Sequence, residues 1–143
     1  MSAASTYLEA KVLNHVLTST SYSAPSTRYV ALFNNTSGNA LANLQQGIIT
    51  DEVSTSGTAY ARQTVTFALA SPSTGAGPSS SATNATVTFP TATASFGSIT
   101  HVAVMDASTS GNVLFFGAVT TAKQIDTGDT FQITSGNLTI ALN

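Results

Sequence analysis

The sequence predicts an all-β protein: an antiparallel β-sandwich of about seven or eight strands with one N-terminal α-helix. Beyond Pro25, short segments of alternating apolar and polar residues recur, and turn-forming residues separate them at intervals of roughly 8–12 residues. The pattern lacks the alternation of strands with helices that indicates a parallel sheet. A length of 143 residues suits one domain over 1–143, with a helix and its lead-in over 1–20 and a sandwich over 25–143.

The first twenty residues contain the segment with a helical pattern. Apolar residues recur there at three- and four-residue spacing and form one stripe, with Glu9, Lys11 and Asn14 assigned to the other face. The stripe consists of Leu8, Val12, Leu13, Val16 and Leu17. Thr6 and Glu9 have the spacing of a capping box at the helix start. Two roles fit such a helix: packing on its own domain, or docking onto a neighbouring subunit.

Seven segments are expected to form strands. They are 28–33, 59–69, 85–89, 99–105, 112–119, 131–134 and 138–142. Alternation is clearest in 59–69, where Val65 and Phe67 share one side and Tyr60 and Arg62 the other. Turn-forming residues predict one hairpin between 99–105 and 112–119, and a second between 131–134 and 138–142. The segment 71–81 is rich in Ser, Gly and Pro and is expected to be a flexible loop.

The composition excludes several classes of protein. Only 7% of the residues are charged, against roughly 25% in an ordinary soluble domain, whereas Ser and Thr supply 43 residues. A net charge of −2 gives no basic surface for nucleic acid or an anionic membrane. No apolar run approaches the ~20 residues that span a bilayer, and no signal-peptide pattern is seen, so we expect folding in a cytoplasm. A surface with so few charges is typical of a subunit that contacts copies of itself or another assembly.

Patterns for catalysis and metal binding are weak. There is no cysteine, and His101 and Asp106 lie in one strand region without a marked serine nucleophile. Asp126 and Asp129 fall in one turn but lack the ligand spacing of a calcium loop. We therefore expect no enzyme, no cofactor and no metal. Carbohydrate binding stays open, because the four tyrosines are candidates for either glycan or subunit contacts. They are Tyr7, Tyr22, Tyr29 and Tyr60.

Seven blocks of sequence, taken in order and spacing, carry a resemblance to a known family. They cover 7–17, 29–33, 60–67, 84–90, 94–101, 112–117 and 128–131. In these blocks the chain resembles a family of small bacteriophage virion proteins that are commonly described as tail fibre or minor structural proteins. The segment 40–53 has no counterpart in that pattern and is interpreted as an insertion, mostly a long loop.

The resemblance implies a virion structural protein that is assembled in the cytoplasm of a bacterial host. A single globular unit of this size suits a capsid decoration (cement) protein, which binds and stabilises the mature shell. The partners expected for that role are the major capsid protein or other virion proteins and further copies of the chain, as a dimer or trimer. Two alternatives stay open: a tail fibre or tail adaptor component, and a module that binds host glycans. Neither nucleic acid nor a membrane is an expected partner.

Six residues are candidate partner contacts. They are Tyr7, Lys11, Arg28, Arg62, Ile48 and Ile49. The first two belong to the predicted helix, and the two isoleucines belong to the segment interpreted as an insertion. Arg28 and Arg62 stand out because cations are scarce, and each is suited to a charge-assisted bond with a partner carboxylate. The alternative for both arginines is a hydrogen bond within their own domain.

Overall fold

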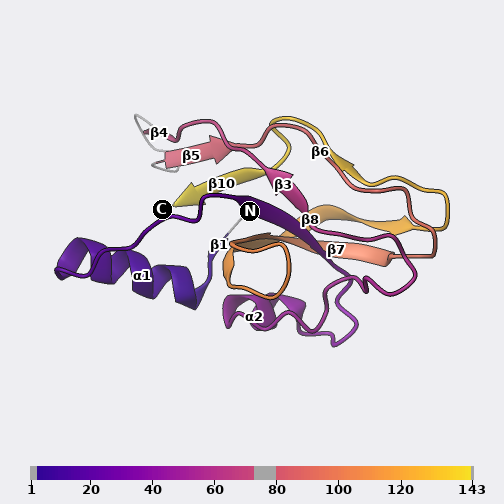
Figure 1. Cartoon of the computed structure of the whole chain (residues 1–143), viewed down its shortest axis with the longest axis horizontal. Coiled ribbons are helices and arrows are strands. Elements are labelled where there is room, and N and C mark those ends of the chain that lie inside the picture. The colour runs from indigo at the N-terminus through magenta and orange to yellow at the C-terminus, as the bar shows by residue number, and fades with distance from the viewer. Residues whose placement is uncertain (1–2, 73–79, 143) are drawn as a thin grey trace.

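The computed structural model describes residues 3–72 and 80–142, which form ten strands and two helices (Figure 1). The strands are β1 (Ala3–Ala4), β2 (Arg28–Phe33), β3 (Gln63–Val65), β4 (Ser71–Pro72), β5 (Ser80–Thr83), β6 (Val87–Thr88), β7 (Gly97–Met105), β8 (Val113–Ile125), β9 (Gln132–Ile133) and β10 (Thr139–Leu142); the helices are α1 (Thr6–Leu17) and α2 (Ala40–Gln45). Of the loop expected over 71–81, both ends are strand residues, and 73–79 lie outside the described residues.

All strand pairs within the described residues are antiparallel, and they form three sheets. The largest has the order β1-β8-β7-β2-β3, a second has the order β10-β5-β4, and β6 pairs with β9. The prediction of a mainly β, antiparallel fold is confirmed. A sandwich is not clearly formed, because the strands outside the open five-stranded sheet make two separate small sheets instead of one second layer.

The hairpin of β7 and β8 was predicted and is confirmed, although β8 continues to Ile125. Asp106 closes its turn by accepting hydrogen bonds from the backbone N–H of Asn112 at 2.6 Å and from its side-chain amide at 2.7 Å. Val104 pairs with Phe115 but Met105 pairs with Val113, so Leu114 is an extra residue in a β-bulge. The bulge places Leu114 and Phe115 on the same side of the sheet as Val104.

The second predicted hairpin is wrong, because β9 pairs with β6 and β10 pairs with β5. The buried residue Asn84, between β5 and β6, binds the turn between β9 and β10. Its Oδ1 accepts from the N–H of Leu138 at 3.0 Å, and its backbone carbonyl accepts from Gly136 N–H and Ser135 Oγ, both at 3.1 Å. Asn84 thus holds the 134–138 turn, and the strands on either side of that turn pair with the strands on either side of Asn84.

The run 59–69 contains only the three-residue strand β3, so its predicted alternation is wrong. Ala59 has a φ of 62°, which breaks the extended backbone, and both Tyr60 and Arg62 turn inward to bind Glu52. Leu69, which the alternation placed beside Val65 on one face, is 95% exposed. The two side-chain bonds to Glu52, which lies eight and ten residues away, therefore override the local period.

The five-stranded sheet is covered on both faces (Figure 1). On one face, Val30 and Ile99 belong to a buried cluster with Phe89 and Phe131 near the β6–β9 pair; the rings of Phe89 and Phe131 meet edge to face at 5.9 Å. On the other face, Leu44 of α2 is buried in a second apolar cluster. The segment 40–53 therefore carries an unpredicted helix that covers the sheet, which corrects its interpretation as a long loop.

Helix α1 begins one residue earlier than the capping box predicted. Ser5 is the buried N-cap: its Oγ accepts from Leu8 N–H at 3.3 Å and donates to the carbonyl of Val113, and its N–H donates to Leu114 at 2.9 Å. Thr6 instead donates from Oγ1 to the Gln45 carbonyl at 3.0 Å. The cap therefore fixes the start of α1 to β8 and α2.

Candidate interaction surface

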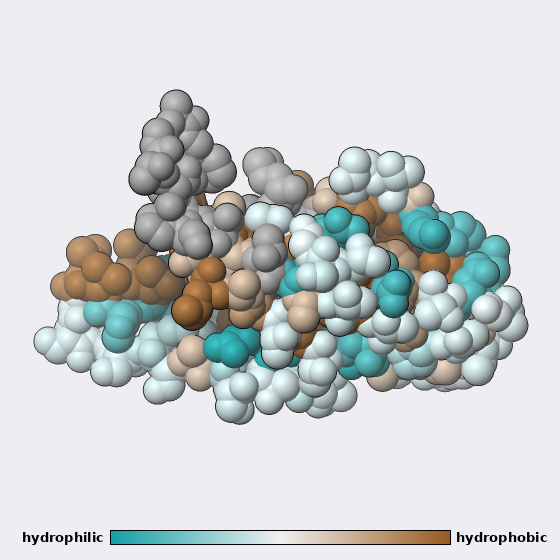
Figure 2. All heavy atoms as spheres, turned by 90° about the horizontal axis from the view of Figure 1, so that it is seen from above, coloured by the Kyte–Doolittle hydropathy of each residue, from teal (hydrophilic) through white to brown (hydrophobic). Residues whose placement is uncertain are grey.

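The apolar stripe of α1 faces away from the rest of the protein. Only Leu8 is buried, where it packs with Val104, Leu114 and Ile140. The other four stripe residues are Val12 (40% exposed), Leu13 (56%), Val16 (71%) and Leu17 (74%). Figure 2 shows apolar side chains gathered over the helix at that end of the molecule. Packing on its own domain therefore accounts only for the first turn, and most of the stripe stays exposed.

Glu9 belongs to this exposed face, which corrects its assignment to the opposite side of the helix. Val12, Leu13 and Val16 follow it by three, four and seven residues, so their side chains project on the same side. The sole ion pair of the described residues joins Arg62 to Glu52, and no described side chain donates a hydrogen bond to Glu9. An exposed apolar face thus surrounds one unpaired carboxylate.

Tyr7 and Lys11, both candidate contacts on α1, interact with each other. The Lys11 Nζ lies 5.5 Å from the centroid of the Tyr7 ring, a cation–π contact, and Tyr7 packs on the cluster around Leu8. Farther along the helix, His15 Nδ1 accepts a hydrogen bond from the backbone N–H of Tyr22 at 3.2 Å. This side of α1 therefore interacts with its own chain.

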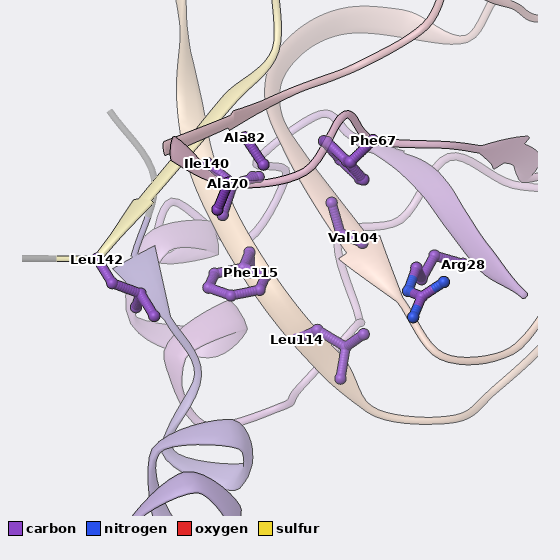
Figure 3. Close-up of a pocket in the computed structure, with 9 residues that line it drawn as sticks. All are labelled: Arg28, Phe67, Ala70, Ala82, Val104, Leu114, Phe115, Ile140 and Leu142. Atoms are coloured by element: carbon purple, nitrogen blue, oxygen red, sulfur yellow. The ribbon is translucent and has the colours of Figure 1, made fainter. Parts of the chain in front are cut away.

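A half-open cavity of about 230 Å³ lies between the five-stranded sheet and the β10-β5-β4 sheet (Figure 3). Its walls are apolar except at Arg28. They consist of Arg28, Phe67, Ala70, Ala82, Val104, Leu114, Phe115, Ile140 and Leu142. The bulge of β8 supplies Leu114 and Phe115, and the small side chains of Ala70 and Ala82 leave the space unfilled. Figure 3 shows Arg28 at one end of the cavity and Leu142 at the other.

Arg28 is half-buried in this apolar wall, and its guanidinium makes neither an ion pair nor a hydrogen bond with a residue that the structure describes. A half-buried cation without a partner contributes little to the stability of its own chain. Its positive charge acts on the nearby Tyr22: burial raises the pKa of Tyr22, as do Tyr7 and Asp106, and Arg28 opposes them. Arg28 therefore gives the cavity one positively charged end.

Arg62, in contrast, is buried and fully engaged inside the chain. Its Nε and a terminal nitrogen donate to the two carboxylate oxygens of Glu52, both at 2.7 Å. Its other terminal nitrogen donates to the carbonyls of Ala107 at 2.8 Å and Ser110 at 2.7 Å. Burial alone would lower the pKa of Arg62, but Glu52 outweighs it and raises the pKa. Arg62 therefore makes its hydrogen bonds within its own chain, which was the alternative to a partner contact, and it links the β7–β8 turn to Glu52.

Tyr60 completes that network. Its hydroxyl donates to Glu52 at 3.0 Å and accepts from the backbone N–H of Leu32 at 3.0 Å. Burial, with the Glu52 charge beside it, raises the pKa of Tyr60. The other three tyrosines are half-buried.

Ile48 and Ile49 follow α2, and their surroundings differ. Ile48 is exposed, whereas Ile49 packs against the cluster that contains Leu44. This cluster lies on the face of the five-stranded sheet opposite the cavity, since Ala103 and Val104 alternate along β7. The structure therefore groups Tyr7 with Lys11 and separates both isoleucines from Arg28.

His101 and Asp106, which the sequence placed in one strand region, make separate hydrogen bonds, His101 with Thr100 and Asp106 with Asn112. His101 Nδ1 lies 2.9 Å from Thr100 Oγ1, and burial lowers the pKa of His101, with Asp51 opposing weakly. Across 3–72 and 80–142, no three His, Cys, Asp or Glu side chains gather as a metal-binding group. Neither helix in those ranges combines the length and apolar character needed to cross a membrane.

The sequence did not predict that Glu9 lies among the exposed apolar residues of α1. Of the residues that line the cavity, it indicated only Arg28 as a candidate contact. The spacing of Glu9 to Val12 and Leu13 was a usable signal for the first. The cavity had no local signal, because its walls come from residues between 28 and 142 that meet only after folding.

Comparison with known protein families gives a match over nearly the whole chain. A family model described as "Podophage GP4 fiber I protein gp80" matches residues 3–141. Comparison with curated proteins yields no match. The family description names a structural fibre protein, which implies a non-enzymatic role in a virion and association with other virion proteins. It supports the tail fibre alternative and overturns the expectation of a capsid decoration protein. The chain therefore belongs to the Podophage GP4 fiber I protein gp80 family, a family of phage tail fibre components.

Proposed function

We propose that this chain is a connecting subunit of the tail fibre, and that it binds a neighbouring fibre subunit through the exposed face of α1. The observation that carries the proposal is the exposure of Val12, Leu13, Val16 and Leu17 on one side of a helix whose start is fixed to the body by Ser5. A contiguous apolar surface of this kind marks an interaction site in proteins that are otherwise well packed.

The energetics of this face suit a stable structural contact. Fully burying one exposed Val or Leu side chain contributes about 1.5–3 kcal/mol, and the four side chains of this face, which are 40–74% exposed, each contribute part of that amount. A contact that is mainly apolar also depends little on ionic strength, which suits a particle that must persist outside its host. With only ten charged residues, the chain has few means of docking by charge.

The test uses phage that carry the double substitution Val16→Ser and Leu17→Ser in this chain. The matched control is Asn14→Ser, an exposed position on the same helix that lies off the apolar face. We expect the double variant to be depleted at least about tenfold in purified particles, as measured by quantitative mass spectrometry, because the apolar contact is lost. The control should be incorporated like the natural chain.

Circular dichroism of the isolated variants checks that both fold. Normal incorporation of a folded double variant would contradict docking through α1. Electron cryomicroscopy of whole particles gives the second readout, and density for the chain on the capsid shell instead of the fibre would contradict a fibre role.

A further inference from the structure

We propose that the neighbour bound by α1 is a second copy of this chain, and that the exposed face of α1 in one copy covers the opening of the Arg28 cavity in the other. This inference rests on the proposed function and names the partner of the same surface. It depends on three observations: a pair of complementary charges, the size of the cavity, and the direction in which α1 leaves the body.

The charge complementarity is specific, because most charged groups of the chain are already engaged. Five of the six acidic side chains accept hydrogen bonds within their own chain. They are Asp51, Glu52, Asp106, Asp126 and Asp129. Glu9 has no such partner in the described chain and lies in the middle of the exposed apolar face. Among the cations, Arg62 is paired, Lys11 lies over Tyr7, and Arg28 is the one set in an apolar wall.

The cavity has the size and lining of a receptor for side chains. At about 230 Å³ it is smaller than the roughly 300–1,000 Å³ of pockets that hold small molecules. Its apolar walls and single cation match a helix face with apolar side chains and one carboxylate. From Glu9 to Leu17 a helix rises about 12 Å. With Glu9 at the Arg28 end, the later stripe residues then lie toward Leu142 (Figure 3).

A helix cannot cover the cavity of its own copy. Leu8 packs against Leu114 and Ile140, which are walls of the cavity, and α1 then extends away from the body (Figure 1). The stripe and the cavity are therefore adjoining parts of one surface that faces a neighbour. A closed arrangement of identical copies, in its smallest form a dimer, covers every stripe and every cavity.

The experiment is a charge exchange on the full chain, with sedimentation equilibrium as the readout. We expect the natural chain to self-associate, and we expect Arg28→Glu and Glu9→Arg each to raise the dissociation constant more than about tenfold, because each places like charges in contact. The combined variant restores the opposite charges and should return to within about threefold of the natural chain. Lys123→Glu, which reverses an exposed cation on β8, is the control and should change little.

A second variant tests the cavity without changing charge. Ala82→Leu fills the space from β5, and a folded variant should lose self-association to a similar extent. A natural chain that stays monomeric at high micromolar concentration would overturn the proposal. Failure of the combined charge variant to recover would also overturn it, whatever Ala82→Leu does.

The two proposals fail in distinguishable ways. If the charge exchange behaves as expected but particles incorporate the α1 variants normally, the fibre contact through α1 is wrong and the self-association stands. If particles lose the α1 variants but the charge exchange leaves the dissociation constant of self-association unchanged, this inference is wrong, and α1 binds a different fibre protein.

Discussion

Arg62 and Arg28 are two of the four cations of the chain, and they lie in contrasting surroundings. Arg62 is buried between Glu52 and the carbonyls of the β7–β8 turn, with four hydrogen bonds at 2.7–2.8 Å. Arg28 lines an apolar cavity and pairs with no residue that the structure describes. The Arg62 network is thus complete within one chain, whereas the region with Arg28 and α1 has unused charge and unused apolar surface.

This contrast distinguishes folding from binding. A buried polar group whose bonds are all made stabilises its own chain, and removing one member leaves the others unpaired. A half-buried charge without a partner contributes little to its own fold and is available for a partner. Substitutions on the Arg62 side should therefore change the free energy of unfolding, and substitutions on the Arg28 side should change association.

The largest effect is expected at Arg62. Arg62→Ala should lower the free energy of unfolding by about 3–5 kcal/mol, because Glu52 and two carbonyls lose their donor in a buried site. Arg28→Ala, the matched comparison, should change it by less than about 1 kcal/mol. Urea denaturation measures both, and equal losses would remove the distinction between the two arginines.

Within α1, Leu8 and Val16 differ in the same way, since Leu8 is buried in its own chain and Val16 is exposed. Leu8→Ala should cost about 2–4 kcal/mol, because the side chain is buried against Val104, Leu114 and Ile140. Val16→Ala should cost less than about 0.5 kcal/mol in the isolated chain, since Val16 is 71% exposed. Thermal unfolding below the concentration of self-association provides the measurement. A large loss at Val16 would mean that the stripe supports its own fold.

The turn that Arg62 binds is expected to tolerate change poorly. Gly111 has a φ of 72°, and an added Cβ would lie 2.5 Å from Asp106 Oδ1 and 2.7 Å from the Ala107 Cβ. Gly111→Ala should therefore cost about 1–3 kcal/mol. Gly128→Ala is the control, because Gly128 also has positive φ but has open space around its Cα. Denaturation of both variants separates the cost of the steric clash at Gly111 from the cost of a positive φ, which both positions share. Equal costs would contradict a tightly packed turn.

The smallest effect concerns pH on the α2 side. Burial alone would raise the pKa of Asp51, but hydrogen bonds from Ser37, Asn43 and Thr36 outweigh it and lower the pKa. Ionised Asp51 therefore stabilises the fold above its unfolded pKa of about 3.9, and this contribution is lost as the pH falls through the lower folded value.

Melting temperature against pH, measured for the natural chain and for Asp51→Asn, checks this expectation. The natural chain should be the more stable at neutral pH, and the difference should shrink below about pH 4. A difference that stays constant down to pH 2.5 would show that the charge of Asp51 contributes nothing.

Elements with local signals could be predicted from the sequence. The β7–β8 hairpin has two apolar strands around a turn of Asp, Ser and Gly, and α1 has a continuous 3.6-residue period. Helix α2 was missed because it has six residues and no side-chain cap at its start. The pairing of β9 and β10 was missed because their partner strands, β6 and β5, lie far earlier in the sequence.

By itself the sequence determined the antiparallel β class, the position of α1 and the scarcity of charge, because propensity, periodicity and composition are properties of neighbouring residues. Only the tertiary structure decided which of those few charges are used. Arg28 and Arg62 look alike in the sequence, because each lies in a segment that is expected to form a strand, 28–33 for Arg28 and 59–69 for Arg62. Arg62 meets Glu52, ten residues away, and the carbonyls of Ala107 and Ser110 across the fold, whereas Arg28 meets apolar side chains. A partner for a charge is supplied by distant segments, so the surface that stays open for a neighbour is known only once the chain has folded.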